Sequence, residues 1–383
     1  MELKEEALIL HENLKGKLEI RSKVQLKDRK DLSLAYTPGV AEPCLKIAQN
    51  KEDVYKYTIK GNCVAVISDG SSVLGLGNIG AEAGIPVMEG KAILFKEFAG
   101  INAFPICLKI QDVQTTIQTI RNIAPVFGGI NLEDFKAPEC FEIESALQDL
   151  GIPVMHDDQH GTAVVVLAGL INSLKLAGKI KESVKIAING SGAAGIAISN
   201  LLFKYGFKNI ILCDTKGAIY EGRGDLNDVK NEMALITNRE KKKGTIHEII
   251  RGSDIFIGVS KGNLLTAEDV KSMNEKAIVF AMANPVPEIM PEEAIKGGAL
   301  IIATGRSDFN NQVNNVLAFP GIFRGALDVR ATRITDEMKI AAAEALASAV
   351  EKSSFDMIIP NPLDKSVTLR VAEAVKKAWL KAH

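Results

Sequence analysis

One segment limits the fold more than any other part of this chain: VKIAINGSGAAGIAISNLLFKYGFKNIILCD, residues 184–214. Its apolar start is typical of a buried strand, and a Gly-x-Gly-x-x-Gly spacing then opens an apolar helix. A second apolar strand ends in an acid about 20 residues beyond the glycines. This order predicts a parallel βαβ unit that binds a dinucleotide, although a tight turn without a ligand would use similar glycines. The predicted cofactor-binding residues are Gly190, Ser191, Gly192, Ala193, Ala194, Gly195 and Asp214.

The same glycine spacing occurs earlier in the chain, at Gly75, Gly77 and Gly80. Here Gly84 and Pro86 follow closely, and we expect them to interrupt any helix within a turn. We therefore interpret the earlier glycines as part of a substrate loop rather than a dinucleotide turn.

Asp214 favours NAD over NADP, because a carboxylate repels the additional phosphate of NADP. Lys216 lies two residues further on and weakens this preference. Both cofactors therefore remain possible.

The length of 383 residues predicts two domains. Short apolar runs alternate with helical patterns from about residue 54 to 155, including a helix predicted over 139–150, and a long apolar helix follows over 161–179. We place the boundary there, with a substrate domain at 1–160 and a dinucleotide domain at 161–383. The predicted fold is α/β: an α/β substrate domain, then a Rossmann-like doubly wound parallel sheet with C-terminal helices.

The charge balance argues against several classes of partner. The chain carries 46 basic and 47 acidic residues, for a net charge of -1, so neither nucleic acid nor an anionic membrane is expected to bind. The longest apolar run, residues 163–171, is about half of what a bilayer span needs, and the N-terminus lacks a signal-peptide pattern. Five scattered cysteines form no CxxC pair. We expect a cytoplasmic protein.

Two carboxylate pairs stand where predicted strands end: Glu133 with Asp134, and Asp157 with Asp158. Adjacent strand residues point to opposite faces, so both acids of a pair can converge only where the strand breaks into a loop. Oxygen ligands of this kind suit Mg²⁺ or Mn²⁺. The alternative is that these acids cap helices and charge solvated turns.

Four further side chains have both a functional and an ordinary interpretation. Lys91 follows the earlier glycine loop and could serve as a general base with a lowered pKa, or it could be a surface lysine. Tyr36 lies before a Thr-Pro-Gly turn and could be a fixed acid or a packed aromatic. His156 and His160 have the spacing of a zinc helix, but we expect the helix to begin only at Gly161.

Several motifs, in one order, resemble the malic enzyme family, specifically its short bacterial and archaeal type. The resemblance extends from about residue 20 to about 330. The motifs are AYTPGVAEPC, VLGLGNIGAEAGIPVMEGKAILFKEFAGI, NLEDFKAP, IPVMHDDQHGTA, INGSGAAGIAI, AMANPVPE and NNQVNNVLAFPGIFRGALD. The resemblance implies oxidative decarboxylation of L-malate to pyruvate and CO₂, with reduction of NAD or NADP and a requirement for Mg²⁺ or Mn²⁺.

The resemblance also implies a role for each matching residue. Lys91 corresponds to the general base, Tyr36 to the acid that protonates C3, and Asp157 to the carboxylate that holds the lysine. Asn284 and Asn315 correspond to amides at the substrate and nicotinamide end of the cleft. The implied metal ligands are Glu133, Asp134 and Asp158.

One departure from the family concerns substrate binding. Many larger members have an arginine just before the first glycine motif, where this chain has Ser71 and Ser72, so the cation for one malate carboxylate must come from elsewhere. The resemblance and the amphipathic terminal helices also suggest a homodimer. Two alternatives stay open: a metal-independent amino-acid dehydrogenase, and a catalytically silent nucleotide-sensing or scaffold protein.

Overall fold

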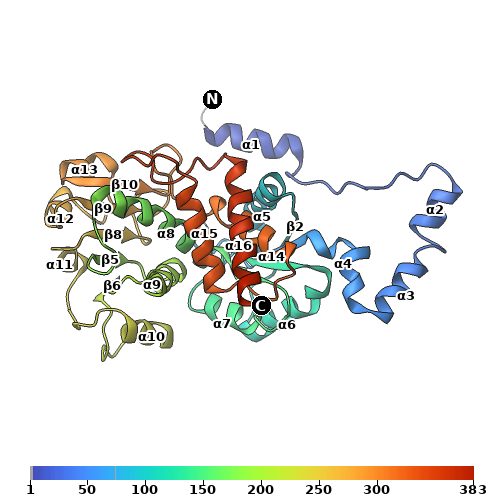
Figure 1. Ribbon diagram of the computed structural model, residues 1–383, viewed down its shortest axis with the longest axis horizontal. Helices are drawn as coiled ribbons and strands as arrows, with labels where there is room; N and C mark the ends of the chain where they lie inside the picture. Colours follow the sequence, from blue (N-terminus) through green and yellow to red (C-terminus); the bar gives the residue numbers. More distant parts are fainter. Residues whose placement is uncertain (1–2, 74) are drawn as a thin grey trace.

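The computed structural model describes residues 3–73 and 75–383, which form two α/β lobes beside an N-terminal arm (Figure 1). The arm contains α1 (Leu3–Leu14), α2 (Arg29–Ala35) and α3 (Ala41–Gln49), and α4 (Val54–Tyr57) joins it to the first lobe. None of these four helices contains a buried residue. In Figure 1, α2 and α3 lie far from α5 and α8, at the outer end of the arm.

The first lobe is built on a four-stranded parallel sheet of order β2-β1-β3-β4. Its helices cover the two faces, as a doubly wound sheet requires. In chain order the elements are β1 (Cys63–Ser68), α5 (Gly80–Ala99), β2 (Asn102–Cys107), α6 (Val113–Ile123), β3 (Gly129–Leu132), α7 (Glu139–Ala146) and β4 (Val154–His156).

The second lobe contains a six-stranded sheet of order β10-β9-β8-β5-β6-β7, parallel except for the β6–β7 pair. The order reverses between β5 and β8, which is the switch point where doubly wound sheets bind ligands. The elements are β5 (Lys185–Asn189), α9 (Ala193–Tyr205), β6 (Asn209–Asp214), β7 (Gly217–Ala218), α10 (Asp228–Ile236), α11 (Ile246–Ile249), β8 (Ile255–Gly258), α12 (Ala267–Lys271), β9 (Ala277–Ala281), α13 (Pro291–Lys296) and β10 (Ala299–Thr304). The predicted α/β fold class is confirmed.

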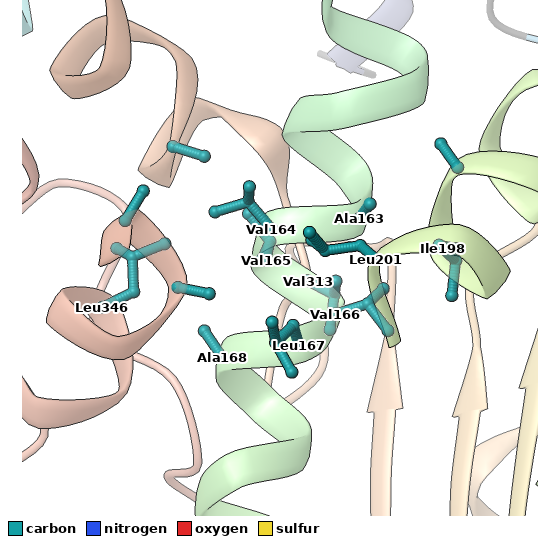
Figure 2. Close-up of a cluster of buried hydrophobic side chains, with 14 of the residues drawn as sticks. Ala163, Val164, Val165, Val166, Leu167, Ala168, Ile198, Leu201, Val313 and Leu346 are labelled. Atoms are coloured by element: carbon teal, nitrogen blue, oxygen red, sulfur yellow. The ribbon is translucent and has the colours of Figure 1, made fainter. Parts of the chain in front are cut away.

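Helix α8 (Asp157–Ala177) connects the lobes and is buried on most sides. Figure 2 shows its apolar side chains, among them Val164 and Val166, between Leu346 on one side and Ile198 and Leu201 on the other. By length and composition alone α8 could cross a membrane, but 72% of that window is buried inside the protein. The run of apolar residues is therefore explained by packing between two lobes.

Three C-terminal helices complete the hydrophobic core: α14 (Phe319–Asp328), α15 (Asp336–Ser348) and α16 (Lys365–Ala382). They do not cover the second lobe alone, because Phe319 and Phe323 of α14 stack edge-on against Phe95 of α5. One buried cluster includes residues from both lobes. The division of the chain at residue 160 therefore stays a prediction.

Two expected helix boundaries within the first lobe were wrong. Gly84 and Pro86 do not interrupt a helix, because α5 runs from Gly80 through both residues to Ala99. Proline removes one helical hydrogen bond, but a helix of 20 residues that buries Met88 and Phe95 offsets that cost through its packing. The helix predicted over 139–150 ends at Ala146, and a turn follows.

Candidate active site

The candidate site lies at the carboxyl edge of the first sheet. Because β1, β3 and β4 are parallel neighbours, the loops that follow them meet at one edge. Backbone hydrogen bonds join these loops: the Ser72 amide donates to the Asp134 carbonyl at 2.9 Å, and the Asp134 amide donates to Asp158 Oδ2 at 2.9 Å. The two carboxylate pairs predicted from the sequence are thus brought together.

Lys91 occupies the centre of this site. It projects from the middle of α5 and is only 7% exposed. Its Nζ donates to Asp157 Oδ2 at 2.6 Å and lies 2.8 Å from Glu133 Oε1. The Phe319 ring centroid is 4.3 Å from the same nitrogen, so one side of the ammonium faces an aromatic ring. The interpretation of Lys91 as a surface lysine is wrong.

Burial and charge act in opposite directions on this cluster. Burial alone would lower the pKa of Lys91, but Asp157, Glu133 and Asp158 raise it above its ordinary value. Burial raises the pKa of Glu133, Asp157 and Asp158, and the Lys91 ammonium opposes that shift in each case. The lowered lysine pKa expected from the sequence is therefore not found in the protein alone, because three carboxylates surround one ammonium.

The charges and donor atoms suit a hard cation. Four carboxylates, Glu133, Asp134, Asp157 and Asp158, gather at this edge with the single ammonium of Lys91, and all of them except Asp158 are buried. Oxygen donors of this kind are what Mg²⁺ and Mn²⁺ prefer. In residues 3–73 and 75–383, however, no three acidic, His or Cys side chains are grouped closely enough to hold a metal. Glu133 instead contacts Lys91 and accepts a hydrogen bond from Asn131.

Asp157 is placed by an unusual contact with its own helix. It is the first residue of α8, and its Oδ1 lies 1.8 Å from where a Cβ on Gly161 would stand. Only a residue without a side chain leaves room for this carboxylate. Asn315 lies on the other side, with its Cβ 3.2 Å from the same point. The structure thus brings Asn315 beside the lysine–carboxylate cluster.

Asn284 contacts the earlier glycine loop from the second lobe. A Cβ added to Gly75 would stand 2.6 Å from the Asn284 carbonyl oxygen, so the earlier glycine loop packs against this residue. A Cβ added to Gly305 would stand 2.9 Å from the side-chain nitrogen of Asn284. Gly75 therefore forms a contact between the lobes, whereas a Cβ on Gly77 or Gly80 would meet nothing within 4 Å.

Helix α8 begins at Asp157, so the expected start at Gly161 was wrong. His160 therefore lies in the first turn of α8 and pairs through Nε2 with Glu144 Oε1 at 2.9 Å. The second Glu144 contact is with the His156 amide, which donates to Oε1 at 2.9 Å. Burial would raise the Glu144 pKa, but His160 and Lys339 lower it to about 2. Glu144 was not identified from the sequence, where only its position next to the apolar Ile143 distinguishes it from a surface acid.

The later glycine turn has the geometry of a dinucleotide site. Gly190 has φ +115, and a Cβ there would stand 2.7 Å from the Val259 carbonyl oxygen. A Cβ on Gly195 would lie 1.7 Å from the Gly190 carbonyl oxygen, whereas one on Gly192 would meet nothing within 4 Å. Two glycines thus permit tight packing and the third faces open space at the start of α9, as the fingerprint requires. Ser191, Ala193 and Ala194 complete this turn.

Asp214 ends β6, as predicted, but its carboxylate already has cationic partners. Arg223 Nη2 donates to both of its oxygens at 2.8 and 2.7 Å, and Lys230 Nζ donates at 2.7 Å. Burial would raise the Asp214 pKa, but these hydrogen bonds lower it. Lys216, considered from the sequence, pairs with Asp225 instead.

Tyr36 is the one predicted site residue that the structure leaves apart from the others. It follows α2 on the arm, 67% of it is exposed, and α2 lies far from α5 in Figure 1. Its interpretation as a packed aromatic is wrong, and its catalytic role stays a prediction.

The fold and site together define a class of protein: a two-lobed dinucleotide enzyme with a buried lysine–carboxylate centre. Family models support this description, since residues 15–115 match the malic enzyme N-terminal domain and residues 159–380 match the malic enzyme NAD binding domain.

Individual relatives agree with these matches. The chain is 60% identical to the bifunctional malic/malolactic enzyme of Bacillus subtilis, over 99% of this chain and 93% of the relative. It is 54% identical to the NAD-dependent malic enzyme of Geobacillus stearothermophilus, over 95% of this chain and 76% of the relative. The crystal structure of malic enzyme from Pyrococcus horikoshii matches with a TM-score of 0.96 at 49% identity, covering 100% of this chain and 91% of that one. The chain therefore belongs to the malic enzyme family, and the resemblance predicted from its motifs is confirmed.

Proposed function

We propose that this protein oxidatively decarboxylates L-malate to pyruvate and CO₂ while reducing NAD or NADP. The main support for the proposal is the buried Lys91, which is held between Asp157 and Glu133. These residues lie at the carboxyl edge of the first sheet. NAD-dependent and NADP-dependent malic enzymes are both found among the relatives, at 54% and 49% identity. A scaffold function would not need a buried lysine with this environment.

Lys91 is the proposed general base. It takes the proton from the C2 hydroxyl of malate while C2 loses a hydride, which leaves a ketone at C2 and a β-keto acid. When bound, the nicotinamide ring supplies the hydride acceptor. Loss of CO₂ from C4 then leaves the electron pair on an enolate, and a proton on C3 gives pyruvate. Asp157 orients the lysine throughout, since its Oδ2 accepts the lysine hydrogen bond at 2.6 Å.

Glu133, Asp134 and Asp158 are the residues proposed to hold Mg²⁺ or Mn²⁺. When bound, the dication acts as a Lewis acid that stabilises the enolate charge by several kcal/mol. The gathering of these carboxylates at one edge supports this assignment, because Mg²⁺ and Mn²⁺ prefer oxygen ligands. Neutralising Glu133 and Asp158 would also remove two of the three carboxylate charges that raise the Lys91 pKa, and so move it towards the range of a general base, although Asp157 would remain.

The test of function follows NADH or NADPH formation by absorbance, with malate, each cofactor and Mn²⁺ or Mg²⁺. We expect malate-dependent turnover that chelation abolishes. Asp158→Ala should remove this turnover, whereas Asp149→Ala, a 68% exposed acid of the same lobe, should retain it. Turnover that survives thorough chelation would favour the metal-independent amino-acid dehydrogenase alternative.

A second pair of variants tests the base. Lys91→Ala should lower kcat about 10²- to 10⁴-fold. Lys96→Ala is the matched control, because Lys96 lies on the same helix and only contacts Asn102 at the surface. Unchanged turnover in Lys91→Ala would favour the silent scaffold alternative over catalysis.

The proposal extends to a homodimer. The arm exposes large apolar side chains along its whole length, including Leu8, Leu10, Ile20, Leu26 and Leu34. A row of this kind is what a partner surface covers. We propose that a second copy of this chain covers this surface. The reaction needs a general acid near Lys91, and Tyr36, the predicted acid, lies on the arm and far from the Lys91 of its own chain.

Tyr36 is accordingly proposed to act in the partner's cleft. Mixing Tyr36→Phe with Lys91→Ala, each inactive alone, distinguishes the two arrangements after subunit exchange. If Tyr36 acts in the partner's cleft, half of the dimers are mixed and each has one intact site, so about a quarter of the wild-type activity returns. If Tyr36 serves its own chain, no site is intact and no activity returns.

A further inference from the structure

A cavity of about 330 Å³ lies at the opposite edge of the second sheet from the dinucleotide turn. It opens where β5 and β6 begin, whereas Gly190 and Asp214 stand where the same two strands end. The cavity is therefore separate from the candidate active site, and none of the residues discussed above as catalytic or cofactor-binding lines it.

The floor of the cavity is apolar and the rim is cationic. Ile186, Ile210 and Ile249 are buried residues of the floor. The rim contributes five cations against the single acid Glu240, although the whole chain has a net charge of -1. The five cations are Lys185, Lys208, Arg239, Lys242 and Arg251.

Most of these cations have no acidic partner. Lys242 pairs with Glu240 at 3.0 Å. Within the described residues, no carboxylate is in ion-pair contact with Lys185, Lys208 or Arg251, and Arg239 only faces the Phe203 ring. The polar groups deeper in the cavity are already satisfied, since Asn238 bonds to Ile219 and Lys242 and Ser253 bonds to Ile250. The cationic side chains of the rim are therefore the groups that are left to bind a ligand.

We propose that this cavity binds a small organic polyanion, a molecule with a compact apolar body and at least two negative charges. Its volume is that of a small-molecule site, and its walls would enclose such a body more fully than they could a macromolecular surface. The unpaired Lys and Arg side chains supply hydrogen bonds and opposite charge for phosphate or carboxylate groups. Nucleoside phosphates and tricarboxylates share this chemistry, and the test separates them.

Binding is measured on the full chain by calorimetry and thermal unfolding, with ATP, citrate and inorganic pyrophosphate as probes. A saturating nicotinamide cofactor is present throughout, so that ATP cannot bind at the dinucleotide turn. We expect ATP or citrate to bind with a Kd below about 1 mM, to raise the unfolding temperature, and to bind more weakly as salt increases. Binding of ATP would identify the ligand class as nucleoside phosphates, and binding of citrate would identify it as tricarboxylates. Pyrophosphate, which lacks an apolar body, should bind more weakly than either.

Variants locate the site. Lys208→Glu combined with Arg251→Glu should weaken binding about tenfold or more, because each loses a charged hydrogen bond. Lys271→Glu combined with Lys377→Glu changes the net charge equally at exposed positions elsewhere and should bind as the wild type does. The proposal is overturned if neither organic probe binds in the presence of the saturating cofactor, or if the cavity variant binds as tightly as the control. Malate turnover is not used in any of these measurements.

Discussion

At the scale of single residues, Gly161 explains why Lys91 has a partner. A methyl group there would occupy the position of Asp157 Oδ1, which lies 1.8 Å from the ideal Cβ. In a helix interior alanine is ordinarily about 1 kcal/mol more favourable than glycine. Glycine at position 161 is therefore less favourable for the helix than alanine, but it leaves the space that the Asp157 carboxylate occupies.

Gly161→Ala should lower malate turnover at least tenfold while leaving the unfolding temperature within a few degrees of the wild type, because Asp157 must move from Lys91. Steady-state kinetics and thermal unfolding of the same sample check this. Gly90→Ala is the matched control in α5, where a Cβ would meet only Lys17 Nζ at 3.7 Å. Full activity in Gly161→Ala would show that Asp157 does not need its present position.

A second residue-scale prediction concerns the choice of cofactor. Arg223 and Lys230 already neutralise Asp214, so the acid should discriminate only weakly against the phosphate of NADP. Arg223→Ala should lower kcat/KM about tenfold or more for NADP and less for NAD, because a charged hydrogen bond to phosphate is lost. Kinetics with both cofactors measure the ratio, and a larger loss with NAD would contradict the expectation.

At the scale of elements, a partly buried ion pair joins α8 to the second sheet. Lys179, just after α8, donates to Asp254 Oδ1 at 2.5 Å, and the Lys185 amide donates to Oδ2 at 2.8 Å. Burial alone would raise the Asp254 pKa, but these bonds and one from Asn274 lower it below its ordinary 3.8. A lowered folded-state pKa stabilises the fold above the unfolded pKa and loses that effect as pH falls through the folded one.

Asp254→Asn should therefore lower the free energy of unfolding by about 2 kcal/mol at neutral pH, because Lys179 loses its partner. The difference from the wild type should remain constant down to about pH 4 and shrink below it. Denaturant unfolding at several pH values measures this. Glu373→Gln removes an exposed i,i+4 pair and should change stability by less than about 0.5 kcal/mol, so equal effects of the two variants would contradict the prediction.

The elements also show where sequence patterns suffice. The strand, glycine turn and helix at 184–205 follow one another directly in the sequence, and Gly195 packs against Gly190 within the same turn, so the pattern is readable even though Gly190 also packs against the distant Val259. Helix α5 is not local, since its packing against β2, β1 and α14 offsets the cost of Pro86. The carboxylate pairs could be placed at strand ends from the sequence. Arg223, Lys230 and Glu144 could not be identified, because their partners are set by tertiary contacts.

At the scale of the whole molecule, the arm differs from the two lobes. It has no buried residue in α1, α2 or α3, so it adds little to the stability of a single chain. Its exposed apolar side chains instead suit association.

A chain that lacks residues 1–50 should therefore keep its two lobes, with near-native circular dichroism, and should run as a monomer of lower mass in light scattering. It should also have no malate turnover, because Tyr36 is absent. A truncated chain that remains dimeric, or one that loses its secondary structure, would contradict this account of the arm.

The return of α14 and α16 to the first lobe has a consequence for biosynthesis. Phe95 emerges from the ribosome long before Phe319 and Phe323, the rings that cover it. Until the last helices are translated, the early lobe presents an open apolar surface to the cell. We therefore expect the first lobe to complete its core only after the last helices have been translated.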